Sequence, residues 1–147
     1  MTLHIEPTTE AEWERYHRRR SREAAKAFVR ACTQSDADEL KAAADFCNDT
    51  DHGWRYSMLR VAGLPSVERK IKAAFLDIWI EQKNLRDRVG DRKALAGALY
   101  VLMACPYQGG PLRLYRGASG AERRAGAYGF SWSSDEARAR LFAEDCR

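Results

Sequence analysis

Features that mark several large protein classes are missing from the sequence. There is no run of about 18 apolar residues, the length needed to span a membrane, so we expect no membrane partner. The first residues lack the basic and then apolar pattern of a secretory signal, which favours a cytoplasmic protein. With 4 prolines and 10 glycines in 147 residues, the chain is neither collagen-like nor of low complexity.

Signals for metal sites and disulfides are absent as well. The 4 cysteines and 3 histidines are scattered, and no two cysteines have the Cys-x-x-Cys spacing typical of zinc sites. We therefore expect no metal, and thiols that stay unpaired in a reducing compartment.

What the sequence does contain is enough apolar material for a core. It is 45% hydrophobic and 31% charged, and its length suits one domain with a small annex. Lysine and arginine number 25 against 21 acidic residues, which gives a net charge of +4. This modest excess permits an acidic partner without requiring one.

The residues before position 107 are predicted to form a helical domain. Thr9 and Glu12 have the spacing of a capping box, which indicates a helix that begins there. Between Ile71 and Leu85, apolar residues recur every three or four positions, which predicts one long helix. Five helices are expected in this region, over about residues 9–31, 35–48, 53–62, 66–89 and 91–105. Short turns between helices are typical of a bundle, and Pro106 would end the last helix.

After this point the apolar residues change from a helical to an alternating period. Residues 112–116 and 128–133 alternate as two strands would, with a loop expected over 117–127. Ser134 is then expected to cap a last helix. The buried stripe of that helix would be Ala137, Leu141 and Phe142.

Together these patterns predict an α+β fold. A helical bundle over residues 1–106 would be followed by a short strand pair plus helix over residues 107–147. Two strands alone do not make a stable sheet. Either the helical bundle covers the two strands, or the remaining strands of the sheet lie beyond Arg147. The second alternative is favoured, so the chain is expected to be truncated before its sheet is complete.

Four residues of the second region form a candidate site. Arg116 ends the first expected strand, and a guanidinium there can make paired hydrogen bonds to a phosphate or carboxylate. Gly117 beside it would let a ligand approach the backbone. Ser131 and Ser133 would place two hydroxyls on one face of the neighbouring strand. The combination suits an anionic, hydroxyl-rich ligand such as a nucleotide.

Structural roles for the same residues stay open. Arg116 could pair with a carboxylate of the protein itself. Ser131 and Ser133 could be ordinary polar residues on an exposed strand face. Ser133 or Ser134 could simply cap the last helix.

Three consecutive pieces of the second region resemble a known family. They are Leu114-Tyr115-Arg116-Gly117, then Tyr128-Gly129-Phe130-Ser131-Trp132-Ser133-Ser134-Asp135, then the Ala137–Ala143 stretch with its Leu-Phe-Ala ending. In this order they resemble the start of the ADP-ribosyltransferase catalytic domain. The likeness is to the branch with an Arg–Ser–Glu motif, which includes many small bacterial and phage proteins.

The resemblance implies an NAD-dependent ADP-ribosyltransferase-like protein. Arg116, with Gly117 beside it, would hold the phosphates and ribose of NAD. Ser131 would shape the nicotinamide-ribose pocket, and Ser133 would support it. The reaction would displace nicotinamide and transfer ADP-ribose to a macromolecular acceptor that the sequence does not identify.

The chain departs from the family in its catalytic glutamate. In the family that residue lies on a later strand and stabilises the cationic transition state. Neither Glu136 nor Glu144 matches its position, so the catalytic residue is unassigned. The chain is accordingly expected to be truncated before this glutamate, and so to be weakly active or inactive.

Two other functions stay open. One is that of a non-catalytic helical interaction protein, whose exposed strand edge would favour self-association. The other is nucleic-acid binding through the basic run Arg18–Arg22. That run spreads around the helix and has glutamates close enough to pair with it, so a solvated surface is the favoured interpretation.

Overall fold

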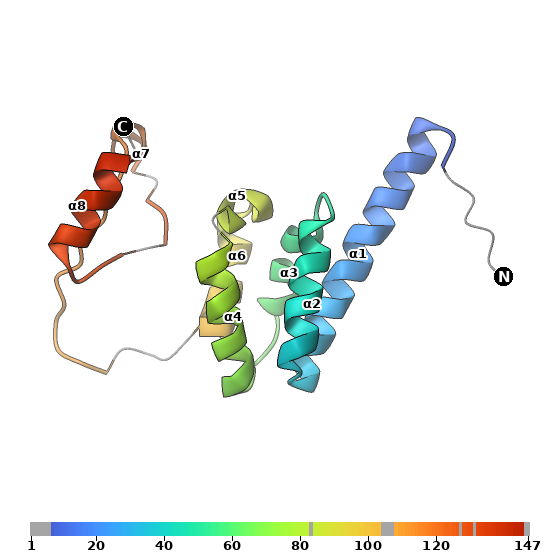
Figure 1. Ribbon diagram of the computed structural model, residues 1–147, viewed down its shortest axis with the longest axis horizontal. Helices are drawn as coiled ribbons and strands as arrows, with labels where there is room; N and C mark the ends of the chain where they lie inside the picture. The colour runs from blue at the N-terminus through green and yellow to red at the C-terminus, as the bar shows by residue number, and fades with distance from the viewer. Residues whose placement is uncertain (1–6, 83, 104–107, 127, 131, 146–147) are drawn as a thin grey trace. The chain divides into compact units, whose positions relative to one another are not determined.

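The computed structural model describes residues 7–82, 84–103, 108–126, 128–130 and 132–145. The chain divides into two compact units, Met1–Cys105 (unit 1) and Pro106–Arg147 (unit 2). All regular structure among the described residues is helical (Figure 1). No described helix is both long enough and apolar enough to cross a bilayer.

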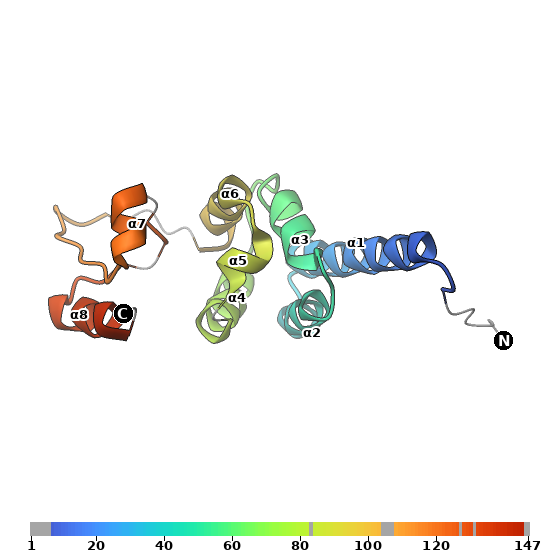
Figure 2. The same ribbon diagram turned by 90° about the horizontal axis from the view of Figure 1, so that it is seen from above.

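Unit 1 is a helical bundle. Its described helices are α1 (Glu10–Gln34), α2 (Ala37–Asn48), α3 (Gly53–Val61), α4 (Arg69–Glu81), α5 (Leu85–Val89) and α6 (Arg92–Met103). Helix α1 packs on α2 and α3, α2 packs on α4, and α3 packs on α6. In both views α2 and α3 therefore lie between α1 and the group formed by α4, α5 and α6 (Figures 1 and 2).

Local capping fixes where the first helices of unit 1 begin. The Thr9 hydroxyl accepts a hydrogen bond from the Glu12 backbone N–H at 3.3 Å. The Glu12 carboxylate accepts from the Thr9 N–H at 3.1 Å, so the predicted capping box is confirmed. At the start of α2, the Asp36 carboxylate accepts from the N–H groups of Asp38 and Glu39.

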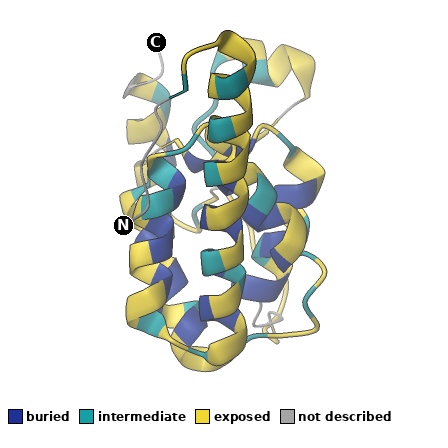
Figure 3. Cartoon of the chain, turned by 90° about the vertical axis from the view of Figure 1, so that its right-hand side faces the viewer, coloured by how far each residue is buried: buried dark blue, intermediate teal, exposed yellow. Residues whose placement is uncertain are grey.

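Three aromatic rings meet in the core of unit 1. The Phe28 ring of α1 lies edge-on to Trp54 of α3, with ring centroids 5.5 Å apart, and to Phe75 of α4, at 6.5 Å. Further apolar side chains of unit 1 are also buried: Leu40, Met58, Val61, Ile71, Leu85, Val89, Leu95 and Leu102. Figure 3 shows the buried residues on the inward sides of these helices.

The single long helix expected over residues 66–89 is wrong. The chain leaves the helical conformation at Gln82, where φ is −85° and ψ is 86°, and α5 begins separately at Leu85. The break lets α5 pack on α3 and α6, where Leu85 and Val89 are buried. The apolar spacing over this segment fits one straight helix equally well, so it is tertiary packing that decides in favour of two helices.

Unit 2 contains two described helices, α7 (Gly120–Ala125) and α8 (Glu136–Asp145). The expected α+β fold is wrong, because the described residues contain no strand. The two segments that were expected to pair as strands meet at one isolated antiparallel bridge, between Tyr115 and Ser133.

The reason that a sheet does not extend from this bridge is lack of burial. A strand pair is stable when one of its faces packs on other parts of the protein. Leu112, Leu114 and Trp132 instead remain 54%, 48% and 49% exposed, so no apolar face holds a longer pairing in register.

Two further expectations for unit 2 need correction. The segment 117–127, expected to be a loop, contains α7, which begins with a capping box between Ser119 and Glu122. Helix α8 is capped by Asp135 rather than Ser134, and its described buried residue is Ala139. Its expected buried stripe is largely exposed, since Leu141 and Phe142 are 62% and 66% exposed.

Candidate functional site

The predicted site residues that the structure describes come together around the one bridge in unit 2. The Tyr115 N–H donates to the Ser133 carbonyl at 2.7 Å, and the Ser133 N–H donates to the Tyr115 carbonyl at 2.9 Å. Arg116 and Gly117 follow the bridge directly on the first segment. Ser131 lies outside the described residues, and so does Pro106, the expected end of the helical region.

The Arg116 side chain is largely enclosed, with 14% of it exposed. Its Nη2 donates to Oε1 of Glu122 at 3.1 Å. Gly129 also lies against the guanidinium, where a Cβ would fall 2.7 Å from Nη2 and 3.1 Å from Cζ. A glycine at position 129 therefore lets the backbone approach the guanidinium closely.

Glu122 takes part in two interactions at once. Its Oε1 accepts from Arg116, while its Oε2 accepts from the Ser119 N–H at 3.0 Å in the capping box of α7. These hydrogen bonds lower the pKa of Glu122. The bond from the Ser119 N–H has the larger effect, and the bond from Arg116 has the next largest. Arg116 thus has the carboxylate partner that its structural alternative requires.

Gly117 faces helix α8 rather than open space. A Cβ on Gly117 would lie 2.5 Å from the Ala139 carbonyl oxygen and 2.6 Å from the Ala143 nitrogen. These are backbone atoms of α8 that cannot move without moving the helix. The absence of a side chain at position 117 therefore serves the packing of α8.

The Ser133 hydroxyl is used in the turn that enters α8. Its Oγ accepts from the Asp135 N–H at 3.0 Å, and Asp135 Oδ1 in turn accepts from the Ala137 N–H at 2.9 Å. Ser133 therefore orders the turn before α8, while the cap of the helix itself is Asp135.

Sequence reasoning missed two residues that position Arg116. Glu122 could have been found from the Ser119-Gly120-Ala121-Glu122 spacing, which is that of a capping box. No signal in the sequence shows that Gly129 lies against the guanidinium, because that contact depends on how the two segments meet.

The described histidine, cysteine and acidic side chains are the candidates for metal ligation and thiol chemistry. No three histidine, cysteine, aspartate or glutamate side chains among the described residues are placed to share a metal ion. Cys32 and Cys47 are buried and free, and burial raises the pKa of their thiols to about 12 and about 11. Cys105 and Cys146 lie outside the described residues.

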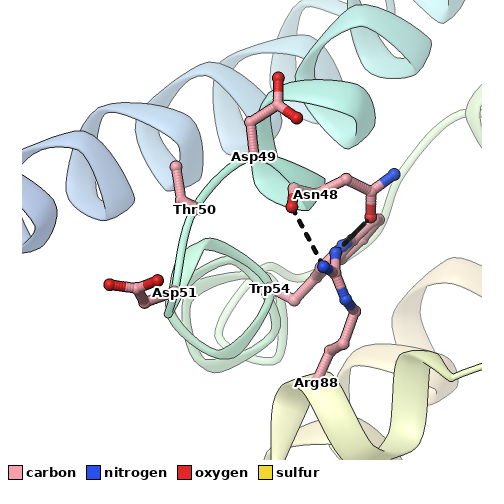
Figure 4. Close-up of a pocket in the computed structure, with 6 residues that line it drawn as sticks. All are labelled: Asn48, Asp49, Thr50, Asp51, Trp54 and Arg88. Carbon is pink, nitrogen blue, oxygen red and sulfur yellow. Dashed lines mark hydrogen bonds between the residues drawn. The ribbon is translucent and has the colours of Figure 1, made fainter.

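Unit 1 has a polar pocket of its own, of about 350 Å³ (Figure 4). The Arg88 guanidinium donates to the Asn48 side-chain oxygen at 2.7 Å and to its carbonyl at 3.1 Å. The Trp54 indole N–H donates to the same side-chain oxygen at 2.8 Å. In Figure 4, Asp49 and Asp51 point away from this cluster. Its donors are directed at Asn48, so the cluster connects α2, α3 and α5.

Comparison of the chain with protein-family models, curated proteins and solved structures found no match.

Proposed function

We propose that the chain is an ADP-ribosyltransferase-like protein that binds NAD through Arg116 in unit 2, and that Gly117, Ser131 and Ser133 also belong to the NAD-binding site. The observation that supports this proposal is the setting of Arg116. An enclosed guanidinium lies where the two segments that resemble the family meet. Such a fixed cation suits the bidentate recognition of a phosphate. The acceptor would be a macromolecule, and no residue of the chain is assigned the part of the catalytic glutamate.

The Glu122 carboxylate competes with NAD in this proposal. This carboxylate accepts a hydrogen bond from Nη2 of Arg116, the same kind of bond that a phosphate oxygen of NAD would accept. NAD would therefore bind by displacing the Glu122 carboxylate from Arg116. The hydrogen bond from the Ser119 N–H to the same carboxylate would remain.

A calorimetric titration of NAD into the full chain tests the proposal. Arg116→Ala removes the guanidinium and should weaken NAD binding by about tenfold or more, the usual cost of losing a charge-assisted hydrogen bond. Glu122→Gln keeps the capping spacing but removes the competing charge, so it should strengthen binding. Arg113→Ala, at an exposed arginine three positions earlier, should bind NAD as the parent does.

The pair of variants separates binding from structure. If Arg116 served only to hold α7 through Glu122, both variants would damage unit 2 alike, which circular dichroism would show. An absence of NAD binding by the folded parent would refute the proposal. Equal loss of binding in Arg113→Ala would refute it too, because binding would then follow general charge.

A second candidate function is favoured by the surface of unit 2. Large apolar side chains are exposed there, among them Leu141 and Phe142 on α8. Exposed apolar groups of this size are typical of interaction surfaces. If unit 2 mediates self-association, Phe142→Ser should shift the chain toward monomer in sedimentation analysis. Leu59→Ser, at a leucine of unit 1 that is 47% exposed, should not.

A further inference from the structure

The outward face of α1 has a stripe of basic side chains, which we call the α1 stripe. Its members are Arg15, Arg18, Arg19, Arg22 and Lys26. They follow one another at offsets of three, four, seven and eleven residues, which places them within an arc of about 100° on a helix with 3.6 residues per turn. At a rise of 1.5 Å per residue the stripe is about 16 Å long. All five residues are exposed.

This arrangement differs from the basic run seen in the sequence. Arg20 belongs to the run but lies off the stripe, where its guanidinium contacts the rings of Tyr16 and Phe46. Arg15 and Lys26 lie outside the run but complete the stripe. The basic surface therefore follows the helical period rather than the consecutive residues.

The stripe faces away from the bundle. The opposite side of α1 is buried against α2 and α3 through residues such as Ala24, Phe28 and Ala31. Figure 3 shows this contrast, because buried residues are dark blue and exposed residues yellow along the helix ribbons of unit 1. The stripe is therefore open to a partner without any change in the packing of the bundle.

Most of the charge on the stripe is not neutralised by the residues that the structure describes. Arg19 lies 3.9 Å from Glu23, in a pair whose arginine side chain is 66% exposed. The other four members make no ion pair with any residue that the structure describes. Helix α1 as a whole has seven basic and four acidic residues, a net charge of +3.

The chemistry of the stripe fits phosphates better than bases or a protein surface. Binding of single strands relies on aromatic rings that stack on bases, but Tyr16, the nearest ring, already packs against Trp13 and His17. Protein interfaces usually have an apolar centre, and no large apolar side chain is exposed within the stripe. A straight row of cations instead matches the regular phosphates of a duplex.

We propose that the α1 stripe binds the phosphate backbone of duplex nucleic acid without reading its sequence. This function goes beyond NAD binding and does not depend on it, because every residue involved lies in unit 1. DNA and RNA duplexes share the phosphate chemistry, so the experiment uses both.

Fluorescence polarisation with labelled duplexes of about 20 base pairs, one of DNA and one of RNA, tests the proposal. For about four phosphate contacts, the dissociation constant of the parent chain should rise roughly 100-fold between about 50 and 200 mM salt. The stripe variant combines Arg15→Gln, Arg18→Gln and Arg22→Gln. It should bind at least about tenfold more weakly at low salt, and its salt slope should fall by roughly three. Glutamine has a helix propensity close to that of arginine, so α1 should remain folded.

A matched control variant removes the same charge elsewhere in unit 1. Arg55→Gln, Arg60→Gln and Lys70→Gln change three exposed residues of α3 and α4, and both triple variants lower the net charge from +4 to +1. The control variant should bind duplex nearly as the parent does. The duplex that the parent chain binds more tightly identifies DNA or RNA as the source of the phosphates.

Two outcomes of the duplex titrations would overturn the proposal: no binding by the parent at low salt, or equal losses of binding in the stripe and control variants. Two other outcomes would overturn it as well. The parent chain could bind polyglutamate more tightly than duplex, or it could show salt-sensitive self-association that the stripe variant abolishes. The polyglutamate result would indicate an acidic protein partner, and the self-association would indicate a second copy of the chain.

Discussion

Unit 1 and unit 2 use the same local signals but differ in what their helices bury. Each contains a capping box at the start of a helix, Thr9 with Glu12 in unit 1 and Ser119 with Glu122 in unit 2. Unit 1 also buries three aromatic rings and many aliphatic side chains, whereas Ala139 is the one apolar residue that is buried among the described residues of unit 2. Unit 2 exposes its large apolar side chains: Leu112, Leu114, Tyr128, Trp132, Leu141 and Phe142.

The difference shows that capping places a helix while burial holds it. A helix of six or ten residues is not stable alone in water, so α7 and α8 depend on their contacts. In unit 2 those contacts are the Arg116–Glu122 ion pair, the bridge to Ser133 and the close approach of Gly117 to α8. Unit 1 is stabilised mainly by hydrophobic burial, and unit 2 by a few polar and backbone contacts.

The largest expected effect is the difference between two phenylalanines. Phe28→Ala removes a fully buried ring from the core of unit 1 and should lower the free energy of unfolding of that unit by about 3–5 kcal/mol. Phe142→Ala changes a residue of α8 that is 66% exposed. It should change the free energy of unfolding by less than about 0.5 kcal/mol. Urea unfolding followed by circular dichroism measures both. Similar losses in the two variants would mean that Phe142 is covered in solution.

A smaller effect is expected from a methyl group at Gly117. Gly117→Ala would place Cβ against the backbone of α8 and should destabilise the packing of that helix by about 1–3 kcal/mol. Faster hydrogen exchange of the α8 amides would show the change. Gly110→Ala is the control, since no described atom lies within 4 Å of its added Cβ. Unchanged exchange in Gly117→Ala would contradict the close approach.

The sequence was most informative where structure depends on neighbouring residues. The start of α1 at Thr9 and the start of α2 after Asp36 follow from side chains that bond to N–H groups two or three residues on. The same signal was present at Ser119 but was overlooked among the glycines and arginines of its segment. Local rules therefore hold in both units.

The sequence was least informative where distant segments decide the outcome. The helix breaks at Gln82 so that α5 can pack on α3 and α6. The spacing of apolar residues along the sequence does not show where those helices lie. Likewise, the alternation over 112–116 predicts a strand, but a strand also needs a covered face. At the candidate site, Arg116 was identified, while its contacts with Glu122 and Gly129 arise from the meeting of two segments.

Within unit 1, the polar cluster at Asn48 offers a test of how much a hydrogen-bond acceptor adds to a packed core. Asn48→Ala removes the side-chain oxygen that accepts from the Trp54 indole N–H and from Arg88, but leaves the backbone carbonyl that Arg88 also bonds; it should cost about 1–3 kcal/mol in the free energy of unfolding. Asp49→Ala, at the exposed neighbouring residue, should cost much less. Equal costs would place the effect in the helix end rather than in the cluster. Urea unfolding with tryptophan fluorescence distinguishes these results.

The smallest expected effect concerns the charge in the α1 capping box. Hydrogen bonds, first from the Thr8 N–H, then from the Thr8 hydroxyl and the Thr9 N–H, lower the pKa of Glu12 from 4.5 to about 2. Because the folded chain binds this proton more weakly than the unfolded chain, the contribution of Glu12 to stability is complete above about pH 4.5. It is lost as the pH falls toward 2.

Glu12→Gln keeps a capping residue that does not titrate. Between about pH 5 and pH 3 its free energy of unfolding should therefore fall less than that of the parent. Glu14→Gln, at an exposed residue of the same helix turn, should retain the pH dependence of the parent. If Glu12→Gln also followed the parent, the acid sensitivity of unit 1 would arise outside this cap.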